Sequence, residues 1–129
     1  MKKRQLGQSL IEFALVATLL LTLLLGGVDF ALAFSSQIAL RNAVAEGGYY
    51  AIQHPYNPAG IQRQVENELA QRKFIQKVSI VVSQCVVDPL GNKQTVITAT
   101  YLHNLLFSYL VPGMQVTLRS QTVVPQLGC

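Results

Sequence analysis

An uninterrupted apolar stretch near the N-terminus dominates the pattern of hydrophobic and polar positions. Sixteen residues between Glu12 and Asp29 carry no charge; seven are Leu, and the others are Ala, Val, Thr, Gly and one Phe. As a helix they would rise about 24 Å, less than the roughly 30 Å hydrocarbon core of a bilayer. A helix over residues 8–28 would rise about 32 Å, which is enough. A helix that spans the membrane therefore takes Glu12 into the lipid, about one turn from its edge.

The helical pattern continues beyond this stretch. The following segment is rich in Ala and Leu and has no proline before Pro55. Its apolar residues at helical spacing are Phe30, Phe34 and Ile38. Gly47-Gly48 is a signal for a helix stop or kink, and His54-Pro55 follows it. The pattern predicts one long helix over residues 8–47 and a connecting loop over residues 49–58.

A short amphipathic helix is predicted next. Asn57-Pro58 resembles a helix N-cap followed by proline at the first helical position. Ile61, Val65 and Leu69 then recur every fourth residue. This spacing predicts a helix over residues 58–72.

Strand patterns fill the rest of the chain. Residues 74–87, 94–101 and 114–124 are rich in Val, Ile and Thr and alternate with polar positions. The turn residues at 88–92 predict that the first two strands form an antiparallel hairpin. Residues 102–111 fit a short helix or an irregular crossover. The predicted fold class is α+β: a long N-terminal transmembrane helix followed by a small domain of one short helix and a three-stranded antiparallel sheet.

Composition and charge placement favour a membrane protein. Only 12% of the 129 residues are charged, against about a quarter in an ordinary soluble domain. The net charge of +4 comes mostly from Lys2, Lys3 and Arg4. No Lys/Arg stripe with interleaved aromatics follows, so no nucleic-acid partner is expected. The positive-inside rule places the N-terminus in the cytoplasm and the C-terminal domain outside the cytoplasm.

Three interpretations of the N-terminal segment compete. It could be an uncleaved signal anchor. It could be a secretory signal cleaved after Ala31-Leu32-Ala33, although Glu12, the length of the run and Asp29 oppose this. The third is a prepilin-type signal.

The third interpretation rests on a resemblance. Residues 6–13, LGQSLIEF, resemble a class III-type prepilin signal, in which a short basic leader ends in Gly and Glu is the fifth mature residue. Residues 7–34 are similar to the opening of TadE-like proteins of tight-adherence (Flp-type) pilus systems. Asp29-Phe30 and Ala33-Phe34 match the late acidic and small-aromatic positions. The Ala/Gly/Tyr block at residues 42–51 also matches, although Gly48 stands where a second Ala is commoner.

The resemblance implies processing and assembly. A prepilin peptidase would cut between Gly7 and Gln8, and Glu12 would pair with the freed amine of a neighbouring subunit. Opposite charges attract strongly in an apolar medium, and each alone is costly there. The alternative is a Glu12 side chain that snorkels to the headgroups. The expected divisions are a leader at 1–7, a transmembrane and extended amphipathic helix at 8–52, and an exported α+β domain at 53–129.

Candidate chemistry in the exported domain is sparse. His54 and His103 are isolated from residues at metal-ligand spacing. The chain has no Gly-rich phosphate loop, G-x-S-x-G or C-x-x-C motif. We therefore expect no enzyme activity, metal, cofactor or small-molecule substrate.

The two cysteines are Cys85 and Cys129. A disulfide between them would hold the C-terminal tail in an oxidising exterior. Two alternatives remain: a buried free thiol at Cys85, and a bond between chains through Cys129.

The leading hypothesis is a pilin-like structural subunit of a tight-adherence pilus. Its partners would be the membrane, the prepilin peptidase, other pilin or pseudopilin subunits and the assembly platform. The alternative is an unprocessed single-span membrane protein with an extracytoplasmic binding domain, and a small secreted binding module is a third hypothesis. The mass of the mature protein separates the three.

Overall fold

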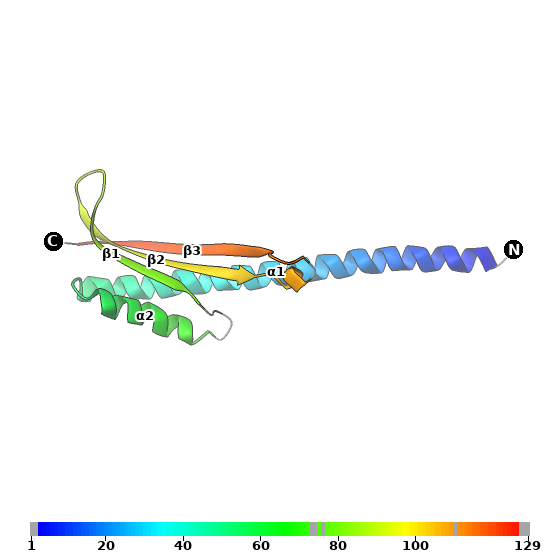
Figure 1. Ribbon diagram of the computed structural model, residues 1–129, viewed down its shortest axis with the longest axis horizontal. Helices are drawn as coiled ribbons and strands as arrows, with labels where there is room; N and C mark the ends of the chain where they lie inside the picture. Colours follow the sequence, from blue (N-terminus) through cyan, green and yellow to red (C-terminus); the bar gives the residue numbers. More distant parts are fainter. Residues whose placement is uncertain (1–2, 73–74, 76, 110, 127–129) are drawn as a thin grey trace.

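A computed structural model describes residues 3–72, 75, 77–109 and 111–126 (Figure 1). The elements in chain order are α1 (Lys3–Gln53), α2 (Pro58–Ala70), β1 (Ser79–Val87), β2 (Lys93–Asn104), the 3-10 helix η1 (Leu106–Tyr109) and β3 (Gln115–Pro125). The N-terminal half of α1 projects alone, and its C-terminal half carries α2 and the sheet. The predicted α+β fold class is confirmed.

The single predicted helix is confirmed, but its predicted end at residue 47 is wrong. The helix passes through Gly47-Gly48 and ends at Gln53, before His54 and Pro55. A Cβ at Gly47 would collide with the Val65 side chain of α2. These glycines therefore serve close packing, which offsets the roughly 1 kcal/mol that a glycine costs inside a helix.

Gly48 has the same role toward the sheet. A Cβ there would lie 3.2 Å from Thr122 Cγ2 of β3, tighter than ordinary contact. Because the helix continues past both glycines, the predicted loop over residues 49–58 shrinks to the residues between Gln53 and Pro58. The domain therefore packs on α1 almost to its end.

The predicted short helix is confirmed as α2. The Asn57 side chain caps it by accepting the Gly60 N–H at 2.9 Å, and Pro58 is its first residue. Ile61, Val65 and Leu69 are buried, so the spacing identified the contact face correctly. The helix ends at Ala70, two residues before the predicted end.

The sheet is antiparallel with strand order β1-β2-β3. The central strand β2 turns Ile97, Ala99 and Tyr101 toward the helices. In β1 the register shifts between Ser83 and Val86. The expected start of the first strand at residue 74 lies outside the described residues, and β1 begins at Ser79.

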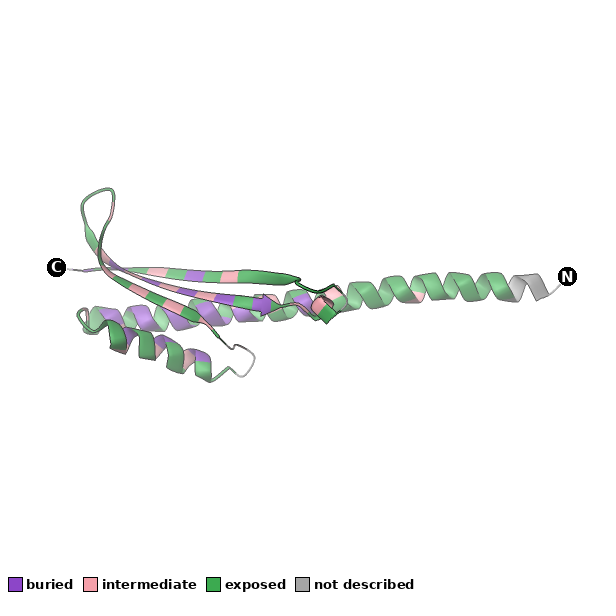
Figure 2. Cartoon of the chain, in the orientation of Figure 1, coloured by how far each residue is buried: buried purple, intermediate pink, exposed green. Residues whose placement is uncertain are grey.

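The core lies between one face of the sheet and the two helices (Figure 2). It combines small and branched side chains of α1, such as Ala43 and Val44, with residues of α2 and β2. A three-stranded sheet needs such backing to be stable. The other face of the sheet is mostly exposed.

Candidate assembly segment and its junction with the domain

The N-terminal half of α1 presents apolar side chains on all sides. It is long and apolar enough to cross a membrane, and none of its most apolar window is buried against the rest of the chain. Exposed side chains include Leu10, Ile11, Phe13, Leu15, Val16, Leu19, Leu20, Leu21, Leu23, Leu24 and Val28. The hydrophobic effect penalises such a surface in water, whereas lipid or other apolar helices would cover it.

The residues predicted for processing and assembly lie in this exposed part of α1. Gly7, Gln8 and Glu12 are all exposed. Gln8 and Glu12 are four residues apart, so they share one face of the helix. After Arg4, the next basic residue in the chain is Arg41, which lies about 43 Å from Glu12 along a helix. No basic side chain on the C-terminal side of Glu12 in α1 can therefore reach it.

The junction between the projecting helix and the domain is built on Asp29. This carboxylate is only 4% exposed. The Leu106 N–H donates to Oδ1 at 2.6 Å, and the Phe107 N–H donates to Oδ2 at 3.1 Å. Both donors open η1, where backbone N–H groups lack partners within the helix. Hydrogen bonds to charged groups contribute about 1.5–3 kcal/mol, so Asp29 fixes the β2–β3 connection to α1.

In the sequence, Asp29 was recognised only as a residue that opposes secretory cleavage and as a match to the family resemblance. A carboxylate immediately after a long apolar run signals a residue with a buried or interfacial partner. The partner itself could not be read from the sequence, because it is the backbone of residues far along the chain.

Further side-chain hydrogen bonds hold the sheet to α1. Gln37 Nε2 donates to the Arg119 carbonyl at 3.0 Å and joins α1 to β3. At the other end of the domain, Gln84 and Gln126 both donate to the Pro55 carbonyl, at 2.7 and 2.9 Å. The sheet is therefore bonded to α1 through Gln37 and to the loop between α1 and α2 through Pro55.

The predicted disulfide remains a prediction, because Cys129 lies outside the described residues. Cys85 is exposed at the irregularity of β1, with a left-handed backbone at φ 56°. Its N–H donates to Gln126 Oε1 at 3.3 Å, and its Sγ lies 3.9 Å from the same oxygen. Gln126 thus brings the end of the described chain to Cys85.

The two histidines lie apart. His54 stacks on Tyr50, with ring centroids 4.5 Å apart. His103 is buried in β2, and neither ring nitrogen has a hydrogen-bond partner in the described structure. The described residues contain no group of three or more side chains that could hold a metal ion. His103 therefore packs as part of the apolar layer.

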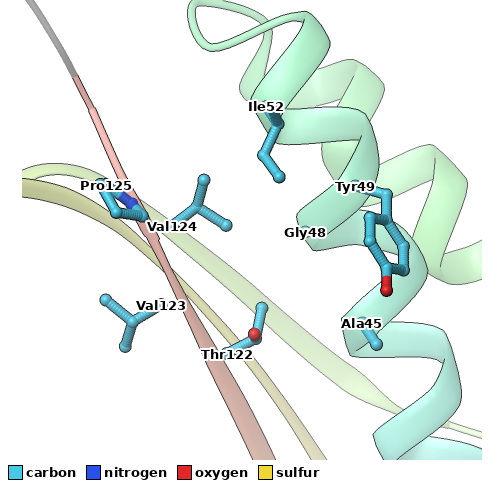
Figure 3. Close-up of a pocket in the computed structure, with 8 residues that line it drawn as sticks. All are labelled: Ala45, Gly48, Tyr49, Ile52, Thr122, Val123, Val124 and Pro125. Carbon is cyan, nitrogen blue, oxygen red and sulfur yellow. The ribbon is translucent and has the colours of Figure 1, made fainter.

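A shallow groove of about 230 Å³ lies between α1 and the end of β3 (Figure 3). Its lining consists of Ala45, Gly48, Tyr49, Ile52, Thr122, Val123, Val124 and Pro125. These side chains supply neither an acid–base pair nor an activated nucleophile. The groove is an apolar surface feature beside the close approach at Gly48.

The comparison with protein families agrees with the N-terminal residues. Residues 7–48 match the family described as TadE-like protein. The match covers the projecting half of α1, Asp29 and most of the part that packs on the domain, and it confirms the resemblance. No curated protein and no solved structure matches the chain. TadE-like proteins are pilin-like and associated with tight-adherence pili, so this family has a structural character.

Proposed function

We propose that this chain, with its TadE-like residues 7–48, is a structural subunit that acts in the assembly of a tight-adherence (Flp-type) pilus. The observation that carries the proposal is the projecting half of α1, which is apolar on every side and contains one acidic residue, Glu12. Such a helix needs lipid before assembly and neighbouring helices after it.

Glu12 supports the proposal through its energetic cost. An acidic residue at mid-membrane costs about 3 kcal/mol on insertion scales, and less near the edge. We infer that the prepilin peptidase removes residues 1–7 and leaves the amine of Gln8 at the membrane edge. That amine, on a neighbouring subunit, is a cation within about one helical turn of the depth of Glu12. The pair stabilises docked helices because each charge alone is costly in lipid.

A second set of side chains supports lateral packing. Phe30 and Phe34 stack with ring centroids 6.2 Å apart and lie on the side of α1 that faces away from the domain. Phe30 is 73% exposed. Ile38 continues this stripe by one more turn. The domain therefore leaves one apolar face of α1 open to neighbouring pilin or pseudopilin subunits.

Orientation follows from the basic cluster at residues 2–4, which we propose stays in the cytoplasm. The domain at residues 53–129 then lies outside, where oxidising conditions permit a disulfide between Cys85 and Cys129. Such a bond would hold the C-terminal tail to the irregularity of β1.

N-terminal sequencing and mass measurement of the membrane-extracted protein test the proposal. In cells with an active prepilin peptidase we expect a chain that starts at Gln8, and in cells without it a chain that starts at Met1. Gly7→Leu should give the Met1 form in both. A Met1 start in the presence of the peptidase would support an unprocessed membrane anchor instead, and a start near Ser35 would support secretion.

A further inference from the structure

The β2–β3 connection lies at the end of the domain from which the projecting half of α1 emerges (Figure 1). We call residues 105–109 and 111–114 the interface loop. Its first turn is held to α1 by the Leu106 and Phe107 N–H groups, which donate to Asp29. A bond from the Leu105 N–H to the Met114 carbonyl, at 3.4 Å, closes the base of the loop. The interface loop is therefore held beside Asp29, at the same position along the axis of α1.

The surface of the interface loop is apolar and uncharged. Residues 104–118 include no Asp, Glu, Lys or Arg. Tyr109 is 90% exposed. The other exposed apolar side chains of the loop are Leu106, Val111 and Met114. Leu102 and Val116 in the adjoining strand ends are exposed too, on opposite faces of the sheet. A group of exposed apolar side chains on one uncharged loop is typical of an interaction site.

The position of Asp29 relative to the bilayer determines what the surface of the interface loop contacts. If residues 8–28 span the hydrocarbon, Asp29 lies at its outer boundary. The headgroup layer beyond that boundary is about 5–7 Å thick on each side of a bilayer. Tyr109 is three residues after Leu106 in η1, or about 6 Å along a 3-10 helix. Tyr109 therefore lies within about 6 Å of this boundary along the membrane normal, whichever way η1 tilts.

We propose that the interface loop inserts into the outer headgroup region of the same bilayer that α1 crosses. The occupant of this apolar surface is lipid, and the argument is continuity with the spanning helix. The proposal rests on the proposed membrane span, but it adds a second attachment, made by the domain itself.

Aromatic placement fits this attachment. Tyr and Trp are enriched at membrane–water interfaces because they have an apolar body and a polar tip. Tyr109 occupies that level beside α1, and Phe30 lies on α1 itself, one residue beyond Asp29. Two contacts on different elements resist tilting of the domain. The subunit is thereby held upright at a set height before it meets its neighbours.

Tryptophan fluorescence tests the insertion directly, because the chain has no tryptophan. Three full-length variants, Tyr109→Trp, Leu90→Trp and Leu19→Trp, each receive a single reporter. Leu90 is 87% exposed on the β1–β2 hairpin at the far end of the domain, so it is the matched control. Leu19 reports the span. Each variant is reconstituted in phosphatidylcholine vesicles whose chains are brominated either near the headgroup or near the chain end.

We expect the Tyr109→Trp emission to shift to the blue and to be quenched most by bromine near the headgroup. The ratio of quenching by the two bromine positions gives the depth of the Trp ring, which should be roughly 5–10 Å into the interface, as for other interfacial segments. The Leu90→Trp emission should stay unquenched, and Leu19→Trp should be quenched from within the chains.

Two results would overturn the inference while the span stands, provided that Leu19→Trp is quenched. One is an unshifted, unquenched Tyr109→Trp emission, which means that the loop is in water. The other is a blue shift without quenching by bromine, which means that a protein surface covers the loop. An unquenched Leu19→Trp would instead remove the membrane span, and the proposed function with it.

Discussion

The two halves of α1 belong to one continuous helix but are built for different surroundings. Residues 8–28 are apolar on every side, and none of them is fully buried. From Asp29 onward the helix buries a single face, composed largely of small residues such as Ala39, Ala43 and Gly47. Small side chains let the sheet and α2 approach the helix axis closely. The apolar surface of the first half is thus not covered by this chain, whereas the buried face of the second half is covered by α2 and the sheet.

This difference shows why the halves differ in their tolerance of change. If the proposed function holds, a side chain in the first half is constrained by lipid and by subunits that dock later. A side chain on the buried face of the second half is constrained by atoms of this chain at contact distance. Matched substitutions on the two sides of Asp29 therefore separate effects on assembly from effects on folding.

The largest effect is expected for Glu12→Ala. Expression and membrane insertion should be spared, since the variant removes an acid from the lipid, but assembly should be lost because the amine of Gln8 loses its partner. The measurement compares the amount of the protein in sheared surface fibres with the amount in the membrane fraction. Glu46→Ala, an exposed acid in the second half, is the control and should assemble normally. Normal piliation by Glu12→Ala would remove Glu12 from the assembly mechanism.

Gly47→Leu should produce the largest folding defect. Its added side chain would collide with Val65, and overpacking of this kind costs typically 1–3 kcal/mol, so about 3 kcal/mol is expected for a residue as large as Leu. The denaturant midpoint of the detergent-solubilised protein measures it. Gly27→Leu is the matched control, since a Cβ at Gly27 meets nothing within 4 Å. Equal midpoints for the two variants would show that the contact of Gly47 with α2 does not constrain the fold.

Asp29→Ala should destabilise the junction by about 2 kcal/mol, because it leaves two part-buried N–H groups without their acceptor. Hydrogen exchange localises the effect. The Leu106 and Phe107 amides should exchange faster, while amides at the centre of β2 should change little. Asp29→Asn keeps one acceptor oxygen and should show a smaller change. Unchanged exchange at both amides in Asp29→Ala would mean that the interface loop is held by packing alone.

Much of this architecture was predictable from the sequence, because helix and strand periodicities are local signals. The spacing of Ile61, Val65 and Leu69 gave the correct face of α2. On α1 the same reasoning found the period but not the side that the domain covers. Phe30 and Phe34 are exposed, whereas the smaller Ala39 and Ala43 are buried. Close approach to a sheet selects small residues there, and hydropathy alone does not reveal this.

What the sequence hid depends on partners far along the chain or in other molecules. Gly47-Gly48 is a stop signal in isolation, and it becomes a packing site only once α2 and β3 lie beside it. The donors to Asp29 are 77 and 78 residues away. For Glu12 the proposed partner belongs to another subunit, so its role remains a prediction.

The smallest effect is expected at the β1–β2 hairpin, the part of the domain farthest from the projecting helix. Hydrogen bonds from the Asn92 side chain and backbone, and from the Leu90 N–H, lower the pKa of Asp88 below its usual 3.8. A carboxylate whose pKa is depressed in the folded state stabilises that state above its unfolded pKa, and the contribution is lost as pH falls through the folded pKa. The hairpin should therefore keep its structure at neutral pH and loosen only below about pH 3.8.

An NMR titration of the Asn92 amide should follow this transition, and Asp88→Asn should abolish the pH dependence. Because Asp88 lies in a surface hairpin, solvent screens its charge. The unfolding midpoint of the domain should accordingly hardly move, and a large acid-dependent shift would show that the hairpin is coupled to the core on α1.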